Sequence, residues 1–202
     1  MGRPTGKRNA GYFARRRALA MAALEALLND DGAPATLKDL AAAAGVSVPT
    51  LKHYFGDRDG LLRAALAAGA GTLSLPRPLD VPPDVALRTV LTATTTAWRE
   101  GTLRALVASG LSLGIGSPTR GPMVIEQLWS PLLAPVEDTL RGHIGQGTLR
   151  PMPTHEAALS LMSPVLMALI EQDLLGGRGR RPIDLDAFID HHVHTFLDQN
   201  RA

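Results

Sequence analysis

Helical periodicity of apolar residues runs through almost the whole of this 202-residue chain and is the feature that most limits its fold. Apolar side chains recur at three- and four-residue spacing in one segment after another, which is the pattern of a helix with one buried face. Runs of β-branched residues that alternate with polar ones, as a half-buried strand requires, are lacking. The sequence therefore predicts an all-α fold.

Nine helices are predicted from these periodic segments and their caps. Four are expected in the first third of the chain, over residues 10–29, 37–44, 48–55 and, capped by Asp57, a fourth that carries Leu61 to Leu66. Five more are expected at about residues 83–99, 101–113, 121–145, 155–175 and 184–199. Residues 69–84, which lie between the two groups, hold four prolines and mark a boundary. We expect an N-terminal domain over residues 1–70 and a C-terminal domain over residues 71–202.

Residues 36–56 contain the signals for two short helices joined by a tight turn. Thr36 can cap the first helix, with Asp39 three residues later in the capping-box position. Ser47 can cap the second helix, and Pro49 suits its first turn because a proline there loses no helical hydrogen bond. Gly45 permits the left-handed conformation that the turn needs. The pattern predicts a helix-turn-helix, although any αα-hairpin with a solvated outer face would have the same periodicity.

The second helix of this pair has chemically distinct faces when its residues are placed at 100° intervals. The sector that we expect to be buried holds Val48, Leu51 and Phe55. The opposite sector would meet base edges if the helix entered a major groove, and it holds Pro49, Thr50 and His53. The two flanks would meet backbone phosphates, and they hold Lys52 and Tyr54.

Charge is unevenly placed along the chain. Residues 1–63 hold ten Lys and Arg against six acids, a formal charge of +4, whereas the remaining residues carry −2. A basic N-terminal region suits a domain that binds a polyanion. Arg15, Arg16 and Arg17 lie near the start of the first helix, where positive charge opposes the helix dipole and does not stabilise the helix. Contact with a nearby phosphate would explain their position. An exposed polar helix face is the alternative.

The sequence lacks the residues that several classes of function require. Cysteine is absent, so disulfides, thiolate nucleophiles and thiolate metal sites are excluded, which suits a cytoplasmic protein. Neither a signal peptide nor a membrane span is expected, and hence no membrane partner. No phosphate-binding loop, zinc-protease motif or serine elbow occurs, so we expect neither catalysis nor a cofactor. His191, His192 and His194 lack an evident fourth ligand, so no metal site is expected.

Residues 36–66, TLKDLAAAAGVSVPTLKHYFGDRDGLLRAAL, resemble the DNA-binding domain of the TetR family of bacterial transcriptional regulators. The matching features include AGVS at residues 44–47, TL at 50–51 and HYF at 53–55. The resemblance covers about residues 10–70, and the rest of the chain agrees in being helical. It implies a homodimer, most often a repressor, in which three-helix heads bind palindromic double-stranded DNA and a C-terminal bundle binds a small molecule.

The resemblance also implies which residues contact DNA. Those that match phosphate contacts are Thr36, Ser47, Thr50, Tyr54 and Arg58, with Arg15 and Arg16 expected nearby. Those that match positions nearer the bases are Val48, Pro49, Lys52 and His53. Lys52 stands where the family usually has tyrosine, so a base contact and a phosphate contact remain alternatives for it.

The C-terminal helices suggest a dimer. The helix at 155–175 is apolar nearly all round, and such a helix must be covered on two sides. Together with the helix at 184–199, it would form a four-helix contact with a second copy. The residues expected in this interface are Leu166, Ile170, Leu174, Phe188, His192 and Phe196.

A ligand pocket in the same domain would combine adaptable apolar side chains with a few polar ones. The residues expected to line it are Thr95, Trp98, Met123, Gln127, Trp129, Met162 and Met167. Helical threonines can instead bond to the preceding turn, so the polar run at 92–98 does not require a pocket. The sequence thus favours a ligand-responsive DNA-binding regulator, and a ligand-independent architectural DNA-binding protein is the alternative.

Overall fold

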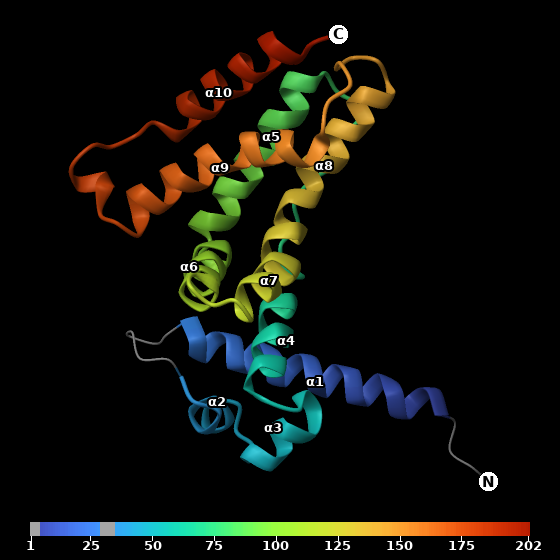
Figure 1. Ribbon diagram of the computed structural model, residues 1–202, viewed down its shortest axis with the longest axis vertical. Helices are drawn as coiled ribbons and strands as arrows, with labels where there is room; N and C mark the ends of the chain where they lie inside the picture. The colour runs from blue at the N-terminus through green and yellow to red at the C-terminus, as the bar shows by residue number, and fades with distance from the viewer. Residues whose placement is uncertain (1–4, 29–34) are drawn as a thin grey trace. The chain divides into compact units, whose positions relative to one another are not determined.

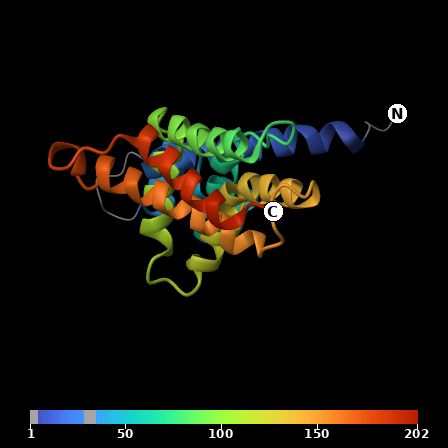
Figure 2. The ribbon, with the colours of Figure 1, turned by 90° about the horizontal axis from the view of Figure 1, so that it is seen from above.

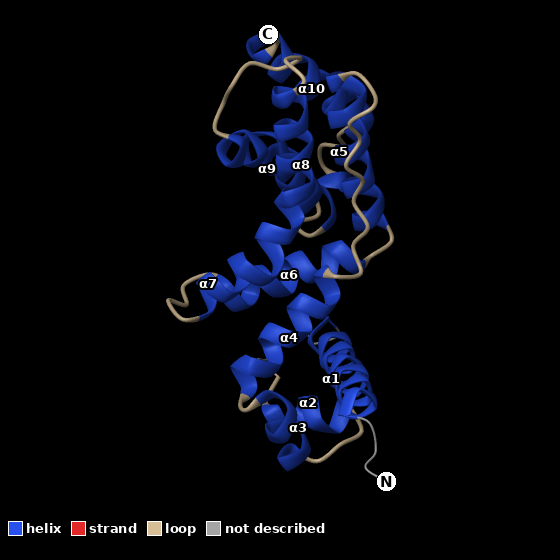
Figure 3. Ribbon diagram, turned by 90° about the vertical axis from the view of Figure 1, so that its right-hand side faces the viewer, coloured by secondary structure: helices blue, strands red, loops and turns tan. Residues whose placement is uncertain are grey.

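The computed structural model describes residues 5–28 and 35–202 and places the side chains of residues 10–27 and 35–202. Within these ranges every regular element is a helix (Figure 3), apart from one isolated antiparallel bridge between Leu149 and Arg201. The prediction of an all-α fold is confirmed. None of the described helices combines the length and the apolar character that a membrane span requires.

The first four helices lie close to their predicted positions. They are α1 (Thr5–Leu28), α2 (Leu37–Ala43), α3 (Val48–Phe55) and α4 (Arg58–Ala70). The predicted end of the first helix at Asn29 lies outside the described residues.

The remaining elements also follow the prediction. They are α5 (Pro83–Arg99), α6 (Thr102–Gly114), α7 (Arg120–Val124), the π-helical η1 (Ile125–Trp129), α8 (Ser130–Gly145), α9 (Thr154–Asp173), the short 3-10 turn η2 (Gly177–Gly179) and α10 (Leu185–Asn200). Because α7, η1 and α8 are consecutive, they form one helical stretch. With η2 set aside, the described residues therefore contain the nine helices that were predicted.

The π-helical segment was not predicted. The sequence suggested one regular helix from 121 to 145, whereas Ile125–Trp129 forms a π-helix within it. Pro131, two residues after this segment ends, has no backbone N–H to donate to the carbonyl of Gln127, four residues earlier. The loss of that donor interrupts the regular hydrogen-bond pattern at this point.

The chain divides into two compact units. Unit 1 comprises the described residues up to Leu73 together with Ala105–Trp129, and unit 2 comprises Ser74–Arg104 and Ser130–Ala202. Residues 105–129 thus pack with the N-terminal helices, although they lie beyond the predicted boundary. The functional division into residues 1–70 and 71–202 stays a prediction.

Unit 1 is organised around α1 and α4, which pack against each other (Figure 1). The α1 helix also contacts α2, and α3 contacts both α2 and α4. Leu40, Leu51 and Leu62 are fully buried in the shared core. Gly69 of α4 permits close packing here, since a Cβ atom on it would lie 2.6 Å from side-chain atoms of Leu24 and Leu106.

Unit 2 is a bundle in which α5 packs against α8, α9 and α10, while α9 also packs against α8 and α10 (Figure 2). Its interior contains fully buried Leu87, Trp98, Leu161 and Leu169.

Candidate nucleic-acid interface

A left-handed glycine and two backbone hydrogen bonds shape the turn between α2 and α3. Gly45 has a φ angle of 63°, and its amide donates to the carbonyl of Ala42 at 3.0 Å. The amide of Val46 donates to the carbonyl of Ala41, also at 3.0 Å, while its side chain packs against the core of unit 1. The predicted helix-turn-helix is confirmed.

The capping box at the start of α2 forms as predicted. The hydroxyl of Thr36 accepts from the amide of Asp39 at 3.3 Å, and the carboxylate of Asp39 accepts from the amide of Thr36 at 2.8 Å. The Thr36 hydroxyl also donates to that carboxylate, and this bond is the main cause that lowers the pKa of Asp39. Asp39 is therefore held as an anion in a fixed place at the start of α2.

The start of α3 is capped by Ser47. Its hydroxyl accepts from the amide of Thr50 at 3.3 Å and lies 2.9 Å from the Thr50 hydroxyl. At the other end, Gly56 has a φ angle of 81° and its amide donates to the carbonyl of Lys52 at 2.9 Å. These local bonds give α3 the length that the sequence predicts.

The inner side of α3 is buried as the sequence predicts, whereas the exposed side differs from the expected one, because Thr50 is partly buried and Lys52, expected on a flank, is exposed. Leu51 is fully buried, and Val48 and Phe55 are partly buried against the core of unit 1. The side chains that lie exposed on the helix are Pro49, Lys52 and His53. A helix with this division can turn its outer face to a major groove while its inner face holds it on the protein.

An aromatic cluster covers the C-terminal end of α3. Tyr54 stacks on Tyr12 of α1, with ring centroids 4.9 Å apart and an interplanar angle of 28°. The His53 ring lies 5.2 Å from that of Tyr54 in an edge-on arrangement. Tyr54, expected to contact a phosphate, is thus also part of the contact between α1 and α3.

Arg16 and Arg58, both expected near phosphates, make intramolecular bonds. The Nε of Arg16 donates to the carbonyl of Tyr54 at 3.3 Å, and its guanidinium lies 5.1 Å from the centre of the Phe55 ring. The Nε of Arg58 donates to the carbonyl of Ala35 at 2.9 Å. Both side chains stabilise unit 1, and neither bond occupies the terminal nitrogens of the guanidinium.

Sequence reasoning missed the contact of α1 with α3. Tyr12 and Arg16 are four residues apart on α1 and so share one face of the helix. That spacing could have indicated that both side chains contact the same neighbouring helix.

None of the expected DNA-contacting residues is buried. Those that lie exposed are Arg15, Thr36, Ser47, Pro49, Lys52 and His53, and those that are partly buried are Arg16, Val48, Thr50, Tyr54 and Arg58. All belong to α1, to the helix-turn-helix or to the first residue of α4. Their contact with DNA stays a prediction.

Acidic groups near this surface are engaged within the protein. Asp57 caps α4 by accepting from the amide of Gly60 at 2.8 Å. Asp59 pairs with Arg120 and Glu126 pairs with Arg63, each at 3.0 Å. Within the described part of the chain, no carboxylate pairs with the exposed cations Arg15, Arg17 and Lys52. The surface can therefore attract a polyanion.

The expected pocket residues fall in different compact units. Thr95, Trp98, Met162 and Met167 belong to unit 2, whereas Met123, Gln127 and Trp129 belong to unit 1. Met123 is buried in the unit 1 core, and Met167 is 61% exposed. The structure thus does not gather the seven residues within one unit, and their role in ligand binding stays a prediction.

Polar groups in the middle of α5 bond to the protein itself. The hydroxyls of Thr94 and Thr95 donate to the carbonyls of Val90 and Thr92. The indole N–H of buried Trp98 donates to Asp173 at 2.8 Å. Burial opposes the charge of Asp173, but hydrogen bonds from Arg178 and Trp98 outweigh it and lower the pKa of this carboxyl. This threonine run therefore satisfies itself, as the sequence allowed.

The expected dimer residues lie on α9, just after it and on α10. Leu166 and Phe196 are buried within unit 2, and Leu174 is 39% exposed. Ile170 and Phe188 are partly buried. Their contact with a second copy stays a prediction.

The three histidines of α10 lie in different surroundings. His192 is partly buried, with Nε2 3.2 Å from the carbonyl of Leu161 and its ring stacked on Phe188. The Nε2 of His194 lies 3.3 Å from the carboxylate of Asp198, while His191 is exposed. Across the described ranges, no three His, Asp or Glu side chains gather in a way that could hold a metal ion.

Comparison with known sequences identifies relatives of the N-terminal part. The sequence profile of bacterial regulatory proteins of the tetR family matches residues 20–65. The HTH-type transcriptional regulator BetI 1 of Chromohalobacter salexigens is 46% identical to this chain over 52 residues. That match spans 26% of each protein, so it covers about a quarter of the relative's length.

Comparison with solved structures extends over nearly the whole chain. The flavonoid-responsive regulator FrrA has a TM-score of 0.72 at 20% identity, and the match covers 94% of this chain and 98% of that one. A TetR transcriptional regulator from Agrobacterium tumefaciens gives 0.69 at 21% identity, with coverage of 93% and 95%. The fatty acid degradation regulator FadR from Bacillus halodurans gives 0.66 at 15% identity, with coverage of 89% and 96%. At these identities the likeness shows a common fold.

Proposed function

Since this chain belongs to the TetR family of bacterial transcriptional regulators, we propose that it is a cytoplasmic repressor that binds a palindromic operator as a homodimer. We further propose that a small molecule releases it from that operator. The observation that carries the DNA-binding part is the shape of α3, a capped helix with a buried inner face and an outer face of Pro49, Lys52 and His53.

The chemistry of this outer face suits a major groove. Lys52 and His53 supply hydrogen-bond donors for base edges or phosphates, and Pro49 supplies an apolar surface. The exposed cations Arg15 and Lys52 suit the phosphate backbone, which supplies most of the non-specific affinity of DNA-binding proteins. The intramolecular bonds of Arg16 hold the end of α3 in place, so less order has to be gained when DNA binds.

Exposed apolar side chains on α9 and just after it support homodimerisation. Leu174 and Met167 expose apolar surface there, and a second copy would cover it. A two-fold dimer presents two copies of α3, which suits half-sites about 34 Å apart. The small-molecule part of the proposal is supported by the description of FrrA as flavonoid-responsive.

The test begins with selection of DNA from a library of random duplexes by the full-length protein. We expect a palindromic site, whose affinity is then measured over a series of salt concentrations. Lys52→Ala should reduce the salt slope by about 1 if Lys52 contacts a phosphate, or relax specificity at one base pair at a cost of about 1–3 kcal/mol if it contacts a base. Arg180→Ala, a change at an exposed arginine of unit 2, serves as the control.

Two results would contradict the proposal in different ways. Selection that yields no preferred sequence, or equal affinities for the Lys52→Ala and Arg180→Ala variants, would remove α3 as the DNA-contacting helix. A sequence-specific protein that shows no ligand-dependent thermal shift with any metabolite tested would instead support the architectural alternative.

A further inference from the structure

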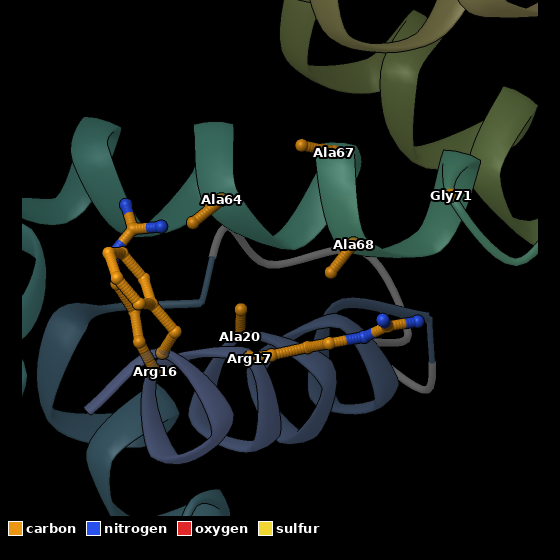
Figure 4. Close-up of a pocket in the computed structure, with 8 residues that line it drawn as sticks. Arg16, Arg17, Ala20, Ala64, Ala67, Ala68 and Gly71 are labelled. Carbon is orange, nitrogen blue, oxygen red and sulfur yellow. The ribbon is translucent and has the colours of Figure 1, made fainter. Parts of the chain in front are cut away.

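A groove with a volume of about 260 Å³ lies between α1 and α4 of unit 1. Short side chains leave it open, with Ala20 on α1 and Ala64 and Ala68 on α4 directed toward the space between the helices (Figure 4). Ala67 of α4 also lines the groove. Gly71, at the end of α4, completes this wall. The middle of the groove is therefore apolar and lacks the large side chains that would fill it.

Two arginines from α1 also line the groove. In Figure 4 the side chains of Arg16 and Arg17 extend in different directions from either side of Ala20, so each brings a guanidinium to a different part of the groove. Arg16 uses Nε for the carbonyl of Tyr54, and its terminal nitrogens have no acceptor within the described part of the chain. Arg17 is exposed and pairs with no carboxylate of the described residues. The groove therefore offers donors for an anion.

Phe13 adds an apolar surface to the same groove. Its side chain is 63% exposed although it is large and apolar, and it lies one turn before Arg16 and Arg17 on α1. Its ring meets the Tyr12 ring edge-on at 5.8 Å, so one side of the phenyl group remains available. An exposed phenylalanine beside two guanidinium groups that pair with no carboxylate of the described residues suits a ligand that is itself partly apolar.

We propose that this groove binds a small organic anion with an apolar body. The anionic group pairs with the guanidinium of Arg16 or Arg17, since guanidinium binds carboxylate and phosphate with two parallel hydrogen bonds. The apolar body lies against the alanine methyl groups and the Phe13 ring. A bare phosphate, from DNA or from solution, would use the charge but leave the apolar part of the groove empty.

The groove is linked to the end of α3 through Arg16. This guanidinium donates from Nε to the Tyr54 carbonyl and lies over the Phe55 ring, so an anion at its terminal nitrogens shares one guanidinium with the C-terminal end of α3. The site is independent of the effector site proposed above, and its test requires no DNA.

The experiment uses the full-length protein with isotope-labelled alanine methyl groups, which report directly on the four alanines of the groove. Phenylbutyrate is the probe, because it joins a carboxylate to a small apolar body. We expect saturable shifts of the four methyl signals with phenylbutyrate. Much smaller shifts are expected with neutral phenylbutanol, which lacks the charge, and with inorganic phosphate, which lacks the apolar body.

Variants locate the site. Arg17→Gln removes one guanidinium from an exposed position and should weaken phenylbutyrate binding about tenfold. Ala67→Leu fills the groove from an exposed position of α4 and should abolish the shifts of the other three alanine signals. Arg15→Gln changes an exposed arginine of the same helix that does not line the groove, and it should leave binding unchanged. Alanine methyl signals of unit 2 verify that each variant is folded.

Three results would overturn the proposal. Equal shifts with phenylbutanol would mean that the groove takes apolar molecules without regard to charge, and equal shifts with inorganic phosphate would mean that no apolar body is recognised. Equal weakening by Arg17→Gln and Arg15→Gln would indicate only general attraction to a basic surface.

Discussion

Arg16 has two roles, since it is expected to contact a DNA phosphate and it also stabilises unit 1. Its charge and its place on α1 suggest a phosphate contact, whereas its Nε bonds to the carbonyl of Tyr54 and its guanidinium lies over Phe55. The carbonyls of the last helical turn lack partners within the helix, so a bond from another element stabilises the end of α3. Arg16 therefore fixes the helix that we propose to enter the groove of DNA.

Replacement of Arg16 by alanine should lower the free energy of unfolding. The loss of one hydrogen bond and one cation–π contact, both partly exposed, predicts a decrease of about 1–2 kcal/mol. Urea unfolding followed by circular dichroism measures it. Arg15→Ala, a change at the exposed neighbour, should stay within about 0.5 kcal/mol of the unmodified protein. Equal losses in the two variants would mean that the bonds of Arg16 contribute nothing.

His143 on α8 is a buried titratable residue, with only 1% of its surface exposed. Its Nδ1 lies 3.1 Å from the hydroxyl of Thr148, and that hydroxyl donates to the carbonyl of His143 at 3.0 Å. The Thr148 oxygen therefore accepts from Nδ1, and Nε2 carries a lone pair that has no partner in the described part of the chain. Burial lowers the pKa of His143.

Stability should fall in mild acid because of His143. Its pKa in the folded protein lies below the ordinary value of 6.5, so in the pH range just below 6.5 the unfolded chain binds a proton that the folded chain does not. Stability from this residue is complete above that pH and is lost as the pH falls through it. Urea unfolding at a series of pH values should show a smaller decline for His143→Leu. Identical pH profiles would show that His143 does not contribute.

At the scale of the elements, helix ends could be predicted and contacts between helices could not. The caps of Thr36, Ser47 and Asp57 involve groups three residues apart, so the local sequence determines them. The bond from Arg16 to Tyr54 joins residues 38 apart, and no local rule predicts it. The same applies to Tyr12, whose stacking on Tyr54 depends on how α1 lies across α3.

The junction of α3 and α4 requires glycine at position 60. A Cβ atom there would lie close enough to the carbonyl oxygen of Phe55 to force the backbone apart. Gly60→Ala should therefore destabilise the protein by about 1–3 kcal/mol, although alanine favours helix more than glycine does. Thermal unfolding measures this change.

Gly11→Ala is the matched control for Gly60→Ala. Gly11 lies on α1 with no atom within 4 Å of the added Cβ, so this variant should gain about 0.5–1 kcal/mol from helix propensity alone. The two substitutions are chemically identical, but the changes that they cause in the free energy of unfolding should have opposite signs. Stabilisation by both would mean that α3 and α4 can separate at this point without cost.

At the scale of the whole molecule, the order of elements could be predicted but their grouping into compact units could not. Residues 105–129 pack with unit 1 because Leu106, Met123 and Leu128 bury their side chains in its core. Their apolar pattern is equally compatible with packing in the C-terminal bundle. Helical periodicity gives the face that is buried but not the partner that covers it, so the sequence could not show that the seven expected pocket residues belong to two compact units.

The exposed apolar surface of α9 leads to a prediction for the assembly of the full-length protein. Met167 is 61% exposed and Leu174, the residue after the helix, is 39% exposed, so glutamate at either position leaves the core of unit 2 intact. If a second copy covers this surface, Met167→Glu and Leu174→Glu each bury an unpaired charge at a cost of about 2–4 kcal/mol. The dimer Kd should then rise roughly 30- to 700-fold, as measured by sedimentation equilibrium.

The control is Val85→Glu, which replaces a similarly exposed apolar residue on α5, with 42% exposure, and should leave the dimer Kd unchanged. An unchanged Kd in both the Met167→Glu and the Leu174→Glu variants would place the dimer contact on another face. A rise in the Kd of all three variants would indicate association through exposed apolar surface in general.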